Sequence, residues 1–226
     1  MTDYNSKKND ILMIFVRFPE PGKVKTSLQP EISPENAARL YRYMIQEILS
    51  HFSEGVSFDI VIKYAPIDKR RALEELLMRH LPVIPQYGFS MGERMLKSMI
   101  WANESGYEKK IIMGSDTLHV SEEIVVAAMN YLDSHDVVLG PSEDGGCYLI
   151  GLKEVKEDLF ADLDWDSGLV FKQALERAKS NNLKVAVLQE LYGIDSISHL
   201  QRCYREIQTS TVFFPIIEPV LHELLT

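Results

Sequence analysis

The stretch PEPGKVKTSL (residues 19–28) carries two lysines, Lys23 and Lys25, close behind Gly22, and it follows the apolar run ILMIFVRF. Cationic side chains next to a glycine at the end of a strand are typical of a loop that binds phosphate. Arg17 adds to this basic cluster in an otherwise acidic chain. We predict that Arg17, Gly22, Lys23 and Lys25 bind the phosphates of a nucleotide. The alternative is that the lysines are solvated residues of an exposed turn.

This loop matches neither of two familiar phosphate-binding motifs. A Walker A loop reads G-x-x-x-x-G-K-[ST], but Val24 stands where serine or threonine should follow, and Arg17 occupies the place of the first glycine. The Rossmann fingerprint G-x-G-x-x-G needs three glycines, and the stretch has one. The residues indicate a short basic loop, stiffened by prolines, at the carboxyl end of a strand.

Two aspartates that follow apolar runs suit a divalent cation. Asp116 lies in Gly114-Ser115-Asp116, whose small residues let a ligand approach the backbone, and Asp195 stands just before SISHLQRCY. Magnesium binds one or two carboxylates together with substrate phosphates. We predict that Asp116 and Asp195 bind Mg²⁺ or Mn²⁺ and that Ser115 contacts the nucleotide. Each aspartate has an alternative role as a helix cap, for which a nearby serine competes, and a turn residue is a further alternative for Asp116. His119 is not included, since a lone loop histidine is more often solvated.

The stretch Glu143-Asp144-Gly145-Gly146 carries two acids and two glycines between apolar runs. An Asp-Gly pair is usual in a tight hairpin turn, but such a turn needs only one of each. Paired glycines also let a ligand approach the backbone closely. We predict that Asp144 binds the acceptor or acts as a general base, and that Glu143, Gly145 and Gly146 line the acceptor site. With Asp116, Asp144 is a predicted catalytic residue.

Gln86 and Gly92 have the character of contacts to a nucleobase. A side-chain amide both donates and accepts hydrogen bonds, and a glycine leaves room for a flat ring. The alternative is a loop glutamine, with the glycine in the first turn of a helix capped by Ser90.

Strands and helices that alternate along the chain must position these residues. Apolar runs predict strands at residues 11–18, 58–64, 83–86, 109–114, 136–140, 147–152 and 184–188. Periodicity and caps predict helices at about residues 33–52, 68–80, 90–105, 121–134, 167–181 and 196–208. This order predicts a three-layer α/β/α fold with a mostly parallel sheet, and the turn PSEDGG predicts a local antiparallel pair. In such sheets ligands bind at the carboxyl ends of the strands, so the site residues should converge on one cleft.

Neither a linker nor an internal repeat interrupts the pattern, so we expect a single domain over residues 1–226. Its core spans about residues 11–207. The apolar tail, residues 208–226, is broken by Pro215 and Pro219. This tail either covers an edge of the core or contacts a partner, as in a homo-oligomer.

Composition excludes several classes of protein. Of 226 residues, 46% are hydrophobic and 25% charged, as in soluble globular proteins. The net charge of −9 disfavours nucleic-acid binding, which depends on a basic surface. No apolar stretch approaches the ~20 residues that span a membrane. Two cysteines give neither a disulfide framework nor a zinc spacing, and the start of the chain lacks a signal peptide, so we expect a cytoplasmic protein.

Three stretches, FVRFPEPGKVKTSL, GSDTLHVSEEIVVAA and DVVLGPSEDGGCYLIGL, together resemble the bacterial GT-A-like transferases called selenodomain-associated transferases, of the nucleotide-diphospho-sugar transferase superfamily. The resemblance covers about residues 11–207, and the basic loop and the EDGG stretch are its most specific parts. It implies a Rossmann-like GT-A fold, a nucleotide or nucleotide-sugar donor and a divalent metal at Asp116. In the superfamily's guanylyltransferases for molybdopterin or phospholactate, the last loop provides a second metal contact, and Asp195 in GIDSISHL holds the matching position.

The chain departs from the family pattern at three places. Around Trp165 the family tends to W-S-T, whereas this chain has Trp165-Asp166-Ser167-Gly168. Ser27 stands where the family usually has an arginine, and Leu118 stands where it commonly has a proline. The loss of one phosphate-facing cation at position 27 leaves open a weaker, altered or inactive donor site.

These features support three hypotheses. The first is a metal-dependent transferase that moves a sugar from a nucleotide-diphospho-sugar to a small-molecule acceptor. The second is a nucleotidyltransferase of the molybdopterin or phospholactate guanylyltransferase type, which would break the bond between the α and β phosphates. Because nucleotidyltransferase loops are rich in glycine and this one has only Gly22, the sequence favours glycosyl transfer. The third is a nucleotide-binding module without catalysis.

Overall fold

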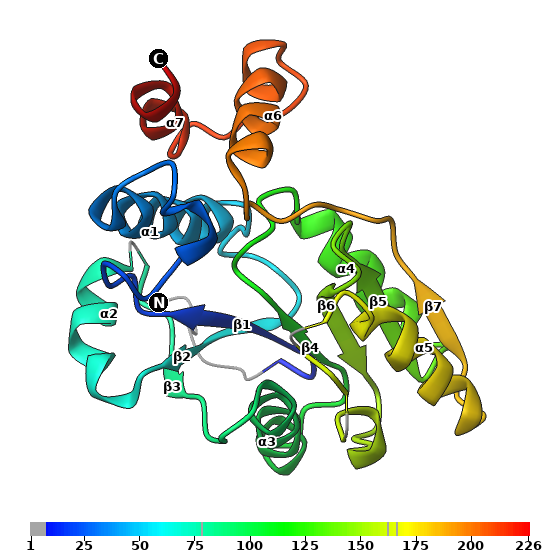
Figure 1. Ribbon diagram of the computed structural model, residues 1–226. Helices are drawn as coiled ribbons and strands as arrows, with labels where there is room; N and C mark the ends of the chain where they lie inside the picture. The colour runs from blue at the N-terminus through cyan, green and yellow to red at the C-terminus, as the bar shows by residue number, and fades with distance from the viewer. Residues whose placement is uncertain (1–7, 78, 162, 166) are drawn as a thin grey trace.

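The computed structural model describes residues 8–77, 79–161, 163–165 and 167–226. In this part of the chain, a seven-stranded sheet has the order β3-β2-β1-β4-β6-β5-β7 (Figure 1). The strands are β1 (Ile11–Arg17), β2 (Asp59–Ala65), β3 (Val83–Pro85), β4 (Lys110–Met113), β5 (Val137–Pro141), β6 (Cys147–Leu152) and β7 (Val185–Val187). Neighbouring strands are parallel, except that β6 is antiparallel to both β4 and β5. The predicted α/β fold with a mostly parallel sheet and a local antiparallel pair is confirmed.

Strand β1 lies between two hydrophobic cores, one on each face of the sheet. Ile14 packs into the core on one face, whereas its neighbours Met13 and Phe15 pack into the core on the other. Both faces of β1 are therefore buried, which explains why its sequence is apolar without alternation.

Helices cover both faces of the sheet (Figure 1). Side chains from α1 (Pro34–Ser50), α2 (Arg70–Leu76), α4 (Glu122–Tyr131), α6 (Ile197–Gln208) and α7 (Glu218–Leu225) enter one core, and those from α3 (Met91–Glu104) and α5 (Val170–Ser180) enter the other. Helix α1 begins where the sequence predicts, because Ser33 Oγ accepts a hydrogen bond from the Asn36 N–H at 3.2 Å. In the described residues, none of the helices is long and apolar enough to cross a membrane.

Several helices are shorter than predicted; α4, for example, ends at Tyr131 rather than at residue 134. Helix α2 does not reach residue 80, because Leu77 adopts an extended backbone that buries its side chain in the core. Its expected first two residues, Asp68 and Lys69, belong to a 3-10 turn instead, Ile67–Lys69. Helix α5 begins at Val170 rather than at residue 167, because the chain before it packs as a loop, with the Gly168 carbonyl against Gly145.

The C-terminal tail folds back onto the core. Helix α7 packs against α1 and α6, and Phe214, Ile217 and Leu221 are buried. Glu47 of α1 is fully buried and accepts hydrogen bonds from the backbone N–H of Ile216 at 2.7 Å and of Ile217 at 2.8 Å. The tail thus covers an edge of the core, which was one of the two expectations. Assembly of a homo-oligomer through the tail stays a prediction.

Candidate functional site

A cleft of about 460 Å³ lies at the carboxyl ends of β1 and β4. After β1 the chain builds β2 and β3 on one side, whereas β4, β6, β5 and β7 lie on the other, so the cleft is where the strand order reverses. Most of the predicted site residues line it, namely Arg17, Lys23, Lys25, Gln86, Ser115, Asp116, Asp144, Gly146 and Asp195. Four of them do not: Gly22, Gly92, Glu143 and Gly145.

Lys25 turns into the cleft from a loop whose other side chains anchor it. Val24 and Leu28 are buried in the core, and Lys25 adopts a left-handed backbone with φ of 46°. This conformation is costly for a residue with a Cβ and persists only where the surroundings enforce it. Lys25 Nζ donates hydrogen bonds to Asp116 Oδ1 and, at 3.1 Å, to Asp195 Oδ1. The loop therefore brings one ammonium group to both predicted metal ligands.

The charges of this cluster do not cancel. Burial lowers the pKa of Lys25, but the attraction of Asp116 and Asp195 outweighs burial, so the pKa lies above its ordinary value. The side chain of Lys25 is 3% exposed, whereas those of Asp116 and Asp195 are 55% and 47% exposed. One buried positive charge thus faces two half-exposed carboxylates, which leaves the cleft negative at this point.

The two carboxylates fit a hard divalent cation that also binds substrate. Among the residues that the structure describes, no group of three or more His, Cys, Asp or Glu side chains is placed to hold a metal ion. Two carboxylates, completed by phosphate oxygens and water, are nevertheless a usual set of ligands for Mg²⁺. Asp116 and Asp195 therefore suit a cation that arrives with a nucleotide better than one that is held by protein alone.

Serines, and not Asp116 or Asp195, occupy the N-cap positions of the two helices that follow these aspartates. Ser196 caps α6, since its Oγ accepts a hydrogen bond from the His199 N–H at 3.2 Å. Ser121 occupies the N-cap position of α4. Neither Asp116 nor Asp195 is needed at a helix start, so both carboxylates can face the cleft.

Gly193 leaves room for the carboxylate of Asp195 next to the Asp116 loop. The backbone N–H of Ile194 donates to the Asp116 carbonyl at 2.9 Å, and a Cβ at Gly193 would lie 2.8 Å from Asp195 Oδ2. The sequence analysis missed this role of Gly193. The signal for it was the glycine two residues before the predicted ligand.

The hydroxyl of Ser115 is used inside the protein. Ser115 Oγ donates to the Phe15 carbonyl at 2.8 Å and lies 2.6 Å from the hydroxyl of Tyr41, which also accepts from the Arg17 N–H at 3.2 Å. Burial raises the pKa of Tyr41 to about 12, with Asp116 adding to the effect. These bonds join the ends of β1 and β4, so Ser115 helps to shape the cleft.

The turn after β5 divides into residues that face the cleft and residues that do not. Asp144 lines the cleft, and its Oδ1 accepts a hydrogen bond from the Gly146 N–H at 2.9 Å. Gly145 has φ of +82°, and a Cβ there would lie 2.0 Å from the Gly168 carbonyl oxygen. Its identity follows from turn geometry and packing, whereas Asp144 stays available to a ligand.

The two residues predicted at the nucleobase differ in position. Gln86 lines the cleft, where its Nε2 donates to the Lys63 carbonyl at 2.7 Å. A Cβ at Gly92 would lie 2.4 Å from Trp165 Nε1 and 2.6 Å from the Phe160 carbonyl oxygen. Gly92 therefore serves close packing against Trp165, which itself lines the cleft.

Two of the three departures from the family pattern, Ser27 and Leu118, also lie outside the cleft lining, whereas the third adjoins Trp165, which lines it. Ser27 is exposed on the 3-10 turn Thr26–Leu28, and Leu118 is fully buried in the core.

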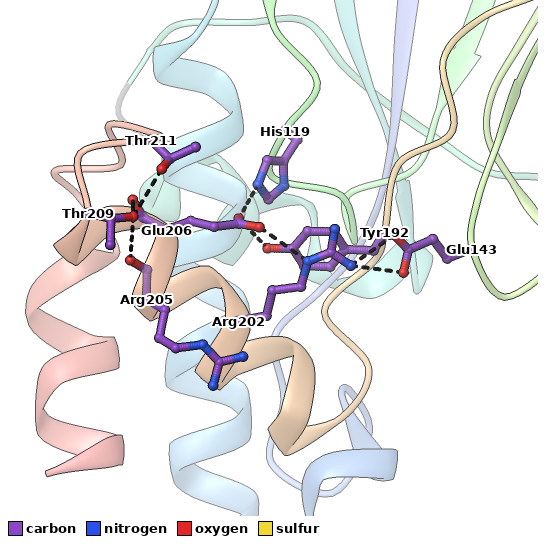
Figure 2. A network of polar contacts seen from close by, with 8 residues as sticks. All are labelled: His119, Glu143, Tyr192, Arg202, Arg205, Glu206, Thr209 and Thr211. Carbon is purple, nitrogen blue, oxygen red and sulfur yellow. Dashed lines mark hydrogen bonds and ion pairs between the residues drawn. The ribbon is translucent and has the colours of Figure 1, made fainter.

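A network of polar contacts ties loops around the cleft to α6 (Figure 2). Glu206 accepts hydrogen bonds from His119 at 2.8 Å, from the Tyr192 hydroxyl at 2.6 Å and from Arg202 Nε at 3.2 Å. Arg202 stacks on the Tyr192 ring, 3.9 Å from its centroid, and pairs with both oxygens of Glu143 at 2.8 and 3.0 Å. His119 follows β4, Glu143 follows β5 and Tyr192 follows β7, so the network fixes three loops to one helix. The sequence analysis missed it, because its members are scattered along the chain.

His119, part of this network, is expected to make stability depend on pH. Burial, the largest cause, lowers its pKa from the ordinary 6.5. The unfolded chain therefore takes up a proton that the folded protein resists, and the free energy of unfolding falls as pH drops from 6.5 toward the folded pKa. His119→Gln keeps an amide that can donate to Glu206 but has no group that titrates in this range. The part of the pH-dependent decrease in the free energy of unfolding that comes from His119 should therefore vanish in this variant. Chemical denaturation between about pH 8 and pH 5 measures it; equal slopes in both proteins would contradict it.

The chain matches one bacterial protein family and several solved structures. Residues 48–167 match the family described as "Uncharacterized protein conserved in bacteria (DUF2064)". A crystal structure described as a "putative nucleotide-diphospho-sugar transferase" from Desulfovibrio desulfuricans G20 is 31% identical, with a TM-score of 0.90 over 96% of this chain and 95% of that chain. The resemblance to nucleotide-diphospho-sugar transferases is thus confirmed. No curated protein matches the sequence.

More distant structures share the fold. CMP:2-keto-3-deoxy-manno-octonic acid synthetase complexed with CTP is 12% identical, with a TM-score of 0.53 over 92% of this chain and 100% of that chain. Rv0371C from Mycobacterium tuberculosis H37Rv, in complex with manganese, is 12% identical, with a TM-score of 0.51 over 87% and 98% of the two chains. At this identity the likeness shows the fold alone.

Proposed function

This chain belongs to the DUF2064 family of bacterial proteins, and on this premise we propose that it is a metal-dependent transferase with a nucleotide-activated donor. The observation that carries the proposal is the cluster of Lys25, Asp116 and Asp195 in the cleft where the strand order reverses. An ammonium beside two carboxylates provides for both the phosphates of a nucleotide and its divalent cation. The relative from Desulfovibrio desulfuricans supports a nucleotide-sugar as the donor.

In this proposal each side of the cleft has its own task. Lys23 and Lys25 bind the donor phosphates, with Arg17 at the same edge. Asp116 and Asp195 hold Mg²⁺ or Mn²⁺, for which the manganese-bound relative gives support. When bound, the cation would neutralise the charge that develops on the leaving diphosphate. The base lies toward Gln86, which follows β3 and lines the cleft.

Asp144 belongs to the acceptor side. It lines the cleft with Gly146, and its carboxylate can take the proton from an acceptor hydroxyl. The acceptor oxygen then bonds to the sugar carbon as the bond from that carbon to the diphosphate breaks. The products are the glycosylated acceptor and a nucleoside diphosphate.

Nucleotidyl transfer is the second candidate, because the fold is shared with a synthetase that binds CTP. In that reaction the acceptor attacks the α phosphate and pyrophosphate leaves. Phosphorus NMR of a reaction mixture separates the two candidates by the phosphorus product.

The donor site is tested by thermal unfolding with UDP, GDP, CDP and ADP, each with and without Mn²⁺. A ligand that binds only the folded state raises Tm, so one nucleotide should raise it in the presence of Mn²⁺. The shift should vanish in Asp116→Asn and persist in Asp68→Asn, a matched change at an exposed aspartate that does not line the cleft. If none of the four nucleotides shifts Tm in the wild type, the donor-site proposal is wrong.

A further inference from the structure

The ammonium of Lys25 lies where a metal ion would be expected, between the carboxylates of Asp116 and Asp195. It donates to an oxygen of each, and its side chain is 3% exposed. Lys23, two residues earlier in the same loop, is exposed and also lines the cleft. The loop thus directs one lysine to the phosphate space and the other to the carboxylates.

A divalent cation and this ammonium cannot share the two carboxylates in this arrangement. The ammonium already bonds to one oxygen of each carboxylate, and a cation on the same pair would lie a few ångströms from this buried charge, where like charges repel. The Lys25 backbone is held by its buried neighbours Val24 and Leu28, whereas its side chain has a flexible four-carbon stem. The movement that relieves the conflict is therefore a swing of the side chain.

We propose that Lys25 is an internal competitor of the metal ion: its ammonium binds the Asp116–Asp195 pair before a divalent cation does, and leaves the pair when the cation binds. The released ammonium then lies in the cleft, where it binds donor phosphate. This inference rests on the proposed function, since the cation and the donor are those of the proposed transferase. The exchange explains why Lys25, which the sequence predicts to bind phosphate, contacts the two predicted metal ligands, Asp116 and Asp195.

The exchange couples the metal to the donor. Metal alone must displace the ammonium, so it binds weakly, while the donor phosphates offer the displaced ammonium a new partner. Metal and nucleotide therefore each raise the affinity of the other by the same factor. Until metal binds, the ammonium also neutralises part of the charge of the two carboxylates.

The affinity for Mn²⁺ without nucleotide, measured by the loss of the free Mn²⁺ signal in electron paramagnetic resonance, tests the exchange. In Lys25→Met, which keeps the length of the stem and removes the charge, Mn²⁺ should bind at least about tenfold more tightly than in the wild type. In Lys23→Met, which removes a charge from the same loop without freeing the carboxylates, affinity should stay within about twofold. Lys25→Met that binds Mn²⁺ no more tightly than the wild type would overturn the inference.

A second measurement uses the wild type alone, in case Lys25→Met does not fold. Acylation of lysines, read by mass spectrometry, should modify Lys25 slowly in the metal-free protein and faster with Mg²⁺ alone. Unchanged labelling of Lys25 at a Mg²⁺ concentration that saturates the protein contradicts the exchange. If nucleotide with Mn²⁺ raises Tm but these two tests fail, only the inference is wrong. If neither Mn²⁺ nor any of the four nucleotides binds, the proposed function fails with it.

Discussion

Gly145→Ala is expected to destabilise the fold by about 3 kcal/mol or more, from a strained backbone and a steric clash together. Gly145 has φ of +82°, which costs a residue with a Cβ roughly 1–2 kcal/mol. The new Cβ would also lie 2.0 Å from the Gly168 carbonyl oxygen. That oxygen belongs to the backbone just before α5, and the Phe171 N–H donates to the Gly145 carbonyl at 3.0 Å. To relieve the clash, either the turn or the start of the helix must move.

Gly22→Ala is the matched control for this change. Gly22 also has a left-handed backbone, with φ of +76°, but a Cβ there would meet no atom within 4 Å. Gly22→Ala should therefore reduce the free energy of unfolding only by the cost of the left-handed backbone, roughly 1–2 kcal/mol. Urea denaturation of both variants measures the difference. Equal losses would mean that the contact with Gly168 contributes nothing, and that the turn adapts to the added methyl group.

Lys25→Met is expected to weaken binding of the nucleotide that stabilises the wild type by roughly 10- to 100-fold. A hydrogen bond between a charged donor and a phosphate is among the stronger polar contacts in proteins. Lys25 is also the buried cation of the cleft, whereas Lys23 is exposed and more easily replaced by solvent. The measurement is titration calorimetry with Mn²⁺ at saturation, so that any change in metal affinity does not enter the result.

Lys69→Met provides the comparison for this loss. Lys69 lies over the Phe18 ring near the same loop, 3.6 Å from Glu20, but it does not line the cleft. Its replacement should leave nucleotide affinity within about twofold, since a charge outside the site that is already paired with Glu20 is largely neutralised and screened by salt. A comparable loss in both variants would point to overall charge rather than to a direct contact of Lys25 with phosphate.

The regular elements were predictable because their causes are local. The run of residues 11–17 is apolar without alternation, which fits only a segment buried on both sides, and it is β1. Ser33 and Ser90 mark helix starts through hydrogen bonds formed three residues ahead. The early end of α2 was not predictable, because Leu77 leaves the helix for a core that is built from distant segments.

The positions of the strand ends predicted which residues lie at the cleft, but not the directions in which their side chains point. Lys25 and Asp116 both come after strands that lie side by side, so their approach was expected. Glu143 also follows a strand, yet it turns to Arg202, 59 residues along the chain. The hydroxyl of Ser115 is likewise taken by Tyr41, 74 residues away. Such choices depend on distant partners, which no local pattern reveals.

The reversed strand β6 gives the two walls of the cleft different origins. Because β6 runs against its neighbours, the chain leaves the cleft edge of the sheet along it and must come back, which it does through Trp165 and Val170. Lys25 and Asp116, in contrast, lie in loops that directly follow strands. Under the proposed function, loops at strand ends hold the donor phosphates and the cation, whereas the connection between β6 and β7 closes another part of the cleft.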